Sequence, residues 1–165
     1  MLIELLLAVT ATSALWVFLA SDETAPKLAA WLSLLPLGLS LYMWTQFDAA
    51  GNALLGGDVA FQTQIDWFEL GQYSLQYHVG VDGVSFPLVI LVTVLTTLAI
   101  VSSWTPIDKR QSQFYGLMLL IETALLGVFT SLDFFLWFIF WEAVLIPMYF
   151  LIAVWGGPRR KYAGA

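Results

Sequence analysis

Five stretches of the chain are apolar almost throughout, and each is long enough to cross a lipid bilayer. A helix of about 20 residues, at ~1.5 Å per residue, spans the ~30 Å hydrocarbon core of a membrane. The pattern therefore predicts an all-α membrane protein with five transmembrane helices over the 165-residue chain. The expected spans are residues 2–20, 28–46, 84–104, 113–131 and 134–155.

The connection between the second and third spans, residues 47–81, is the only long one. It begins rich in glycine and alanine and then alternates between apolar and polar residues on both sides of Leu70-Gly71-Gln72. Period-2 alternation around a glycine-containing break predicts a β-hairpin lying on the membrane surface. Its apolar face is expected to rest on the helix ends; the alternating residues are Phe61, Thr63, Ile65 and Trp67, then Tyr73, Leu75, Tyr77 and Val79.

Two polar residues close to this connection have a structural and a functional interpretation. His78 is the only histidine; it is either a surface residue of the hairpin or a proton relay, because histidine titrates near neutral pH. Asp82 precedes the third span, where either its carboxylate or the Ser85 hydroxyl is expected to cap the unpaired N–H groups of the first helical turn.

The basic residues orient the predicted helices. They fall in the connections 1–2 and 3–4 and after the fifth span, whereas the other two connections hold none. Because cytoplasmic connections carry the excess of Lys and Arg, the N-terminus and the hairpin are expected outside and the C-terminus in the cytoplasm. The six basic residues are Lys27, Lys109, Arg110, Arg159, Arg160 and Lys161.

The composition supports a membrane protein and excludes several kinds of chemistry. Sixty per cent of the residues are hydrophobic and 11% are charged, whereas a soluble domain carries roughly 25% charged residues. The net charge of −6 argues against a nucleic-acid partner. With no cysteine and one histidine, a zinc site or an iron–sulfur cluster is not expected, so neither a metal nor a cofactor is assigned to this chain.

Two carboxylates lie near the middle of an expected span, Glu122 in the fourth and Glu142 in the fifth, whereas Glu4 lies near the end of the first span. A carboxylate near the middle of a bilayer costs several kcal/mol unless it is partnered, hydrated or neutral. Each is ~13 Å from the membrane face at which its own span begins, so two antiparallel helices hold carboxylates near mid-depth, and if they face each other, one of them is expected to hold a proton. The functional interpretation is proton transfer, and the structural one is a protonated acid that joins two helices.

Three further residues extend this candidate path. Tyr149 lies seven residues after Glu142 and Tyr115 seven before Glu122, so each shares a helical face with its glutamate. Pro147 cannot donate to the carbonyl of Ala143. A free carbonyl beside Glu142 favours an ordered water there.

The run FFLWFIFWEAVLIPMYFLIAVWGG resembles the fifth span of the M-type (chain 4) antiporter-like membrane subunits of respiratory complex I, NADH–quinone oxidoreductase. The segments GVDGVSFPLVIL and FYGLMLLIETALLGVFTSLD are similar to the same family's third and fourth spans. The resemblance covers most of the chain and identifies it as the N-terminal part of a longer, multi-pass protein of an energy-transducing membrane such as the plasma membrane.

The resemblance implies a role for Glu142 in proton pumping. It lies at the position of the family's essential glutamate of the fifth span, which pairs with a lysine of the seventh span while quinone is reduced in other subunits. No lysine lies inside the five expected spans. A C-terminal part or a second polypeptide is therefore expected to supply it, with other membrane subunits of the complex and the lipid bilayer as partners.

Two alternatives remain open at this point. The chain belongs either to complex I or to a related multi-subunit cation/proton antiporter or membrane-bound hydrogenase. A different class, a non-catalytic membrane scaffold, requires both glutamates to be protonated residues that only pack helices together.

Overall fold

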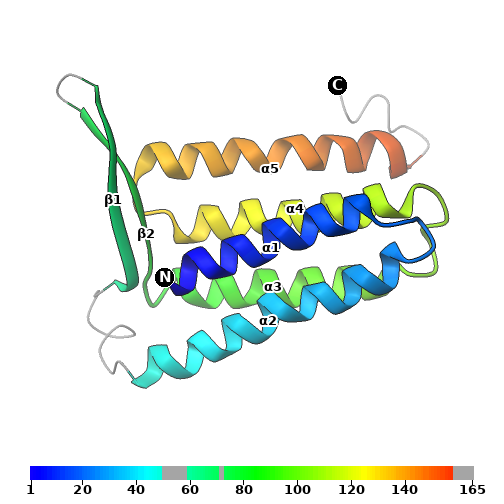
Figure 1. Ribbon diagram of the computed structural model, residues 1–165, viewed down its shortest axis with the longest axis horizontal. Helices are drawn as coiled ribbons and strands as arrows, with labels where there is room; N and C mark the ends of the chain where they lie inside the picture. The colour runs from blue at the N-terminus through cyan, green and yellow to red at the C-terminus, as the bar shows by residue number, and fades with distance from the viewer. Residues whose placement is uncertain (50–58, 71–72, 158–165) are drawn as a thin grey trace.

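The computed structural model describes residues 1–49, 59–70 and 73–157, which form five helices and one antiparallel hairpin (Figure 1). The expected spans are confirmed, with ends that shift by three residues at most. The elements are α1 (Leu2–Leu19), α2 (Ala25–Ala49), β1 (Ala60–Leu70), β2 (Tyr73–Val81), α3 (Ser85–Ser102), α4 (Gln111–Thr130) and α5 (Phe134–Trp155). Most of the glycine-rich segment, the hairpin turn at 71–72 and the basic residues Arg159, Arg160 and Lys161 lie outside the described residues.

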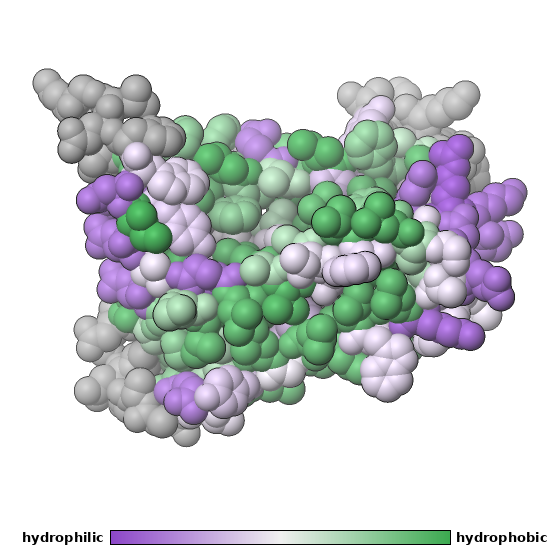
Figure 2. Space-filling model, in the orientation of Figure 1, coloured by the Kyte–Doolittle hydropathy of each residue, from purple (hydrophilic) through white to green (hydrophobic). Residues whose placement is uncertain are grey.

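The five helices lie side by side, with α4 packed against each of the other four (Figure 1). All five are long and apolar enough to cross a membrane. In Figure 2 hydrophobic residues cover the middle of the visible face, and hydrophilic residues gather towards its two ends. The described basic residues Lys27, Lys109 and Arg110 lie at the end opposite the hairpin, which is called the basic end below.

The four helices α1 to α4 enclose the interior, and α5 covers one side of it. Apolar clusters fill both ends of the bundle, around Phe86 at the hairpin end and Tyr115 at the basic end. Between them, hydroxyl groups join α2 to α3: Ser40 and Thr93 are hydrogen-bonded at 3.0 Å, and Thr97 donates to the Ser33 carbonyl at 3.3 Å. Such bonds hold membrane helices together where burial of apolar surface cannot.

The hairpin crosses the end of the bundle and continues past α5 (Figure 1). Its strands pair antiparallel, with Ile65 opposite Tyr77 and Gln64 opposite His78. The base of the hairpin rests on the helices as expected, since Val79 and Val81 are fully buried there.

The expectation that the whole apolar face lies on the helix ends is wrong for the outer half of the hairpin. Ile65 and Trp67 are 55% and 45% exposed. A strand of 11 residues reaches ~36 Å, so it extends beyond the helices that support its base. Register shifts between Ala60 and Thr63 and between Asp66 and Phe68 also interrupt the alternation.

The strand β2 is fixed to the turn between α4 and α5. The Leu132 N–H donates to the His78 carbonyl at 2.9 Å, and Val79 forms a bridge with Ser131. Gly80 permits this approach, because a Cβ there would overlap the Val59 side chain and lie 2.8 Å from Leu132 Cδ1. The hairpin is thereby connected to the two helices that carry Glu122 and Glu142.

The two polar residues near the third span have structural roles in the fold. The Asp82 carboxylate accepts from the Val84 and Ser85 N–H groups at 3.0 and 2.6 Å, which confirms the predicted cap of α3. These bonds, the Ser85 one foremost, lower the pKa of Asp82. The His78 ring is hydrogen-bonded to the Gln62 side chain on the hairpin, in agreement with a surface residue.

Asp22, in the connection between α1 and α2, caps the start of α4. Its carboxylate accepts from the Ser112 N–H at 2.9 Å and from the Ser112 hydroxyl at 2.7 Å. Arg110, at the N-cap position itself, has a left-handed backbone and makes no side-chain cap bond. The bonds from Ser112 lower the pKa of Asp22.

We therefore expect Asp22→Ala to lower the free energy of unfolding by about 1 kcal/mol, the usual value of a helix cap. Because the pKa of Asp22 is lower in the folded chain, the stabilisation is complete above its ordinary pKa of 3.8. It is lost as the pH falls through the lower, folded-state pKa. Thermal unfolding of the purified subunit in detergent at neutral and acidic pH measures both effects. Asp22→Asn keeps an acceptor oxygen and is the control; an equal loss in both variants contradicts the cap.

Candidate functional site

Glu142 lies on the exposed side of α5, near the middle of the helix. Asp133 fixes the start of α5 by accepting from the Phe135 and Leu136 N–H groups at 2.9 and 3.0 Å. Only Leu136 and Pro147 of this helix are buried. Glu142 therefore faces away from the four-helix interior, and an ionisable group on that surface requires a partner or water inside a membrane.

Glu122 has the opposite environment. Its side chain is 0% exposed within the bundle, and neither carboxylate oxygen has a hydrogen-bond partner among the described residues. An ionised carboxylate without a partner is unfavourable in such a site. A proton or a bound water is needed to make Glu122 compatible with its surroundings.

The two glutamates lie at the same depth but do not face each other. Glu122 is eight residues before Thr130 and Glu142 eight residues after Phe134, so both are ~12 Å from the hairpin end. One is buried in the bundle and the other is on the surface of α5. The sequence left open whether the two glutamates face each other. They do not, because the side of α5 that faces α4 carries Phe140, Ala143 and Pro147.

A groove of about 240 Å³ lies between α4 and α5 at the depth of the two glutamates. Thr123, the neighbour of Glu122, and Ala143, the neighbour of Glu142, are on opposite walls of the groove. Pro147 also lines it and leaves the Ala143 carbonyl without its helical donor. The groove thus brings a free backbone acceptor close to the two positions that carry carboxylates.

Each of the two tyrosines has the same environment as the glutamate on its helix: Tyr115 is buried in the bundle, and Tyr149 is on the exposed face of α5. Tyr149 is 51% exposed and shares the outer face of α5 with Glu142. Tyr115 is fully buried, and its hydroxyl, like the Glu122 carboxylate, has no hydrogen-bond partner among the described residues. The polar groups therefore form two lines along the membrane normal, Tyr115–Glu122 within the bundle and Glu142–Tyr149 outside it.

Gly127, which determines how closely α4 and α5 approach each other, was not predicted from the sequence. A Cβ on Gly127 of α4 would overlap the Phe140 ring of α5. The missing side chain lets the two helices approach closely. A glycine inside an apolar span was the available signal, since small residues mark helix contacts in membranes.

The sequence of the chain matches a known family over residues 27–132. The description of that family is "NADH-ubiquinone oxidoreductase chain 4, amino terminus". The chain belongs to this family. Together with the five candidate spans, membership makes it a multi-pass membrane protein and confirms the family to which the sequence motifs pointed.

Individual relatives support this assignment. NADH-quinone oxidoreductase subunit M of Escherichia coli is 36% identical over 139 residues, which are 82% of this chain and 27% of the relative. F(420)H(2) dehydrogenase subunit M of Methanosarcina mazei is 37% identical over 131 residues, 79% of this chain and 25% of the relative. The chain 4 member described here thus spans about a quarter of the length of these curated relatives.

A solved structure shares the fold of this chain 4 member. A chain of the Mrp complex from Dietzia sp. superposes with a TM-score of 0.78 at 21% identity, over 99% of this chain and 17% of that one. At this identity the likeness is one of fold. Within the described residues no group of three or more His, Cys, Asp or Glu side chains has the arrangement of a metal site.

Proposed function

We propose that the chain is the N-terminal part of a proton-translocating subunit of NADH–quinone oxidoreductase and that Glu142 is its switchable proton site. The observation that carries the proposal is the position of Glu142, at mid-depth on the unpacked face of α5 in a chain 4 family member. In this proposal electron transfer takes place in other subunits, and this chain holds no redox centre or cofactor.

The partner of Glu142 comes from outside the described residues. Of the described lysines, Lys27 lies in the first turn of α2 and Lys109 in the connection before α4, both at the basic end. A cation at mid-depth must therefore belong to another helix that covers the outer face of α5. When that cation moves away, an uncovered Glu142 takes up a proton, and its return releases the proton.

The internal line supplies the proposed route to this site. Tyr115 and Glu122 occur seven residues apart on one face of α4, and their side-chain oxygen atoms have no hydrogen-bond partner in the described part of the chain. Waters between them would carry protons from the basic end to mid-depth, and the groove beside Thr123 and Ala143 continues towards Glu142. By the positive-inside rule this route begins at the cytoplasmic side, with the N-terminus and the hairpin outside.

The test of the internal line is Glu122→Gln in the full-length subunit of the assembled complex. Gln keeps the size of the side chain and removes the titrating proton, so proton pumping in membrane vesicles is expected to fall about tenfold, roughly 1.4 kcal/mol in the barrier. Electron transfer and assembly are expected to stay near the wild-type level. Thr123→Ser, which keeps the neighbouring hydroxyl on the groove wall, is the control and is expected to pump normally.

A scaffold is the second candidate, and the complete burial of the Glu122 side chain within the bundle is the observation that favours it. A permanently protonated acid would only hold helices together. Wild-type pumping in Glu122→Gln and in the corresponding variant of Glu142 supports the scaffold and contradicts the proposal. The names of relatives also include F(420)H(2) dehydrogenase and the Mrp complex, so a related cation/proton antiporter complex is the alternative within the same class.

A further inference from the structure

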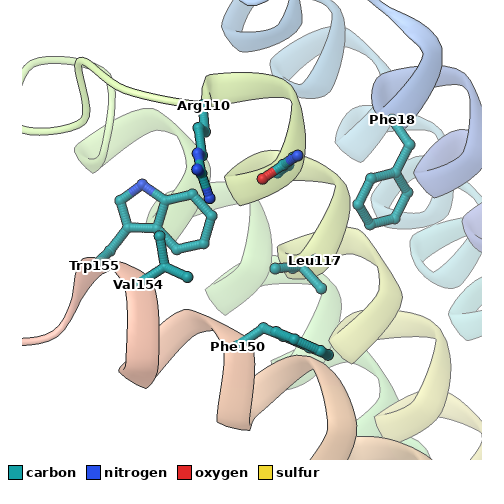
Figure 3. A pocket seen from close by; sticks show the side chains of 7 residues that line it. Phe18, Arg110, Leu117, Phe150, Val154 and Trp155 are labelled. Atoms are coloured by element: carbon teal, nitrogen blue, oxygen red, sulfur yellow. The ribbon is translucent and has the colours of Figure 1, made fainter. Parts of the chain in front are cut away.

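A groove of about 410 Å³ opens where the beginning of α4 meets the end of α5 (Figure 3). Its walls are mostly apolar and come from three helices, with Phe18 on α1, Leu117 on α4 and Phe150 on α5; Gln113 is the polar, uncharged residue of the lining. Arg110 extends into its mouth beside the Trp155 ring and is the one charged side chain among the described residues that line it. The groove therefore combines a long apolar wall with a cation at one end.

The cation lies at the depth where phospholipid headgroups are found. Arg110 directly precedes α4 at the basic end, where Lys27 and Lys109 also lie. The Trp155 indole N–H donates to the Lys109 carbonyl at 3.0 Å, and its ring packs edge-to-face on Phe114 with centroids 5.4 Å apart. Tryptophans held in this way mark the membrane–water boundary.

The charge of Arg110 is not neutralised within the described part of the chain. The one ion pair found there joins the Met1 ammonium to Glu4, at the hairpin end of the bundle. The guanidinium group presents a planar set of donors that matches the oxygens of a phosphate. An anion bound at the mouth of the groove would neutralise the charge of Arg110.

We propose that this groove binds an anionic phospholipid of the leaflet at the basic end. The headgroup phosphate accepts from Arg110 and lies near Trp155, and one acyl chain follows Phe18, Leu117 and Phe150 towards the bilayer centre. A water-soluble anion would make no use of this apolar wall. A basic site between transmembrane helices is the arrangement that recognises anionic lipid headgroups.

A second groove has the same construction, which supports this interpretation. It has a volume of about 390 Å³ and lies between the beginning of α2 and the end of α3, again at the basic end. Lys27 supplies its charge, Trp31 and Trp104 its aromatic rings, and Leu34 part of its apolar wall. A cation, indole rings and an apolar slot thus occur together twice at the same membrane surface.

The test uses the assembled complex in nanodiscs with equal amounts of phosphatidylglycerol and phosphatidylcholine. Native mass spectrometry counts the lipids that stay bound after release of the complex from the nanodiscs. We expect the wild type to retain phosphatidylglycerol in preference to phosphatidylcholine. In Arg110→Gln this preference is expected to fall about fivefold, the effect of one basic residue near an anionic membrane surface.

Three variants distinguish a specific site from general attraction. Lys109→Gln removes the same charge one residue away but outside the groove, and it is expected to retain the wild-type preference. Arg110→Lys keeps the charge and most of the binding, whereas Leu117→Trp fills the groove and lowers retention with Arg110 intact.

Three outcomes overturn the proposal. The first is an unchanged preference in Arg110→Gln, and the second is an equal loss in Lys109→Gln. The third is the finding, in a density map of the complex, that a protein helix occupies the groove. None of these depends on proton pumping, so the lipid site and the proposed function are tested separately.

Discussion

Glu142→Gln in the full-length subunit is expected to abolish proton pumping by the assembled complex, with a loss on the order of a hundredfold or more. The amide keeps the shape of the side chain and cannot exchange a proton. Since Glu142 is exposed on α5, away from the side of the helix that faces α4, and glutamine has nearly the same size, assembly is expected to be normal. Proton uptake and electron-transfer rates, measured together on membrane vesicles, give the ratio of protons pumped per electron.

The controls for this variant lie on the same helix face. Glu142→Asp keeps a titrating group and is expected to retain part of the pumping. Tyr149→Phe removes a hydroxyl from the same exposed face and is expected to have a smaller effect than Glu142→Gln. Full pumping by Glu142→Gln, with normal assembly, rules out Glu142 as the proton site.

Gly127→Val is expected to have the largest effect on stability, about 3 kcal/mol, because overpacking a close contact forces backbone movement. The new side chain would collide with Phe140, and α5 would have to move away from α4. The groove between Thr123 and Ala143 would widen with it. Thermal unfolding of the subunit in detergent measures the loss of stability.

Gly38→Val is the matched control for Gly127→Val. Gly38 lies inside α2, and a Cβ at this position meets no atom within 4 Å. The same substitution in a helix of the same bundle is therefore expected to be nearly neutral. Equal destabilisation by both variants would show that helix propensity, rather than the contact with Phe140, determines the effect.

The five helices and the hairpin could be predicted from the sequence because each has a strong local sequence pattern. Apolar length determines the five spans, and alternation together with a glycine-containing break determines the hairpin. The cap of α3 by Asp82 follows from a carboxylate placed just before a helix. These features depend on residues close together in the chain.

The features that sequence could not supply all depend on contacts between distant segments. The rotation of α5 about its axis decides whether Glu142 faces Glu122, and Phe140 and Gly127 determine that rotation. The cap of α4 comes from Asp22, 90 residues away from Ser112. The exposed outer half of the hairpin follows from the width of the bundle beneath it, which periodicity does not encode.

The central claim is that Glu142 changes its protonation state when the complex turns over. Infrared difference spectroscopy of the assembled complex, oxidised minus reduced, tests it most directly through the carbonyl stretch of protonated carboxylic acids. The account predicts a difference band in this region that disappears in Glu142→Gln and persists in Tyr149→Phe. An identical spectrum in the wild type and in Glu142→Gln would contradict it.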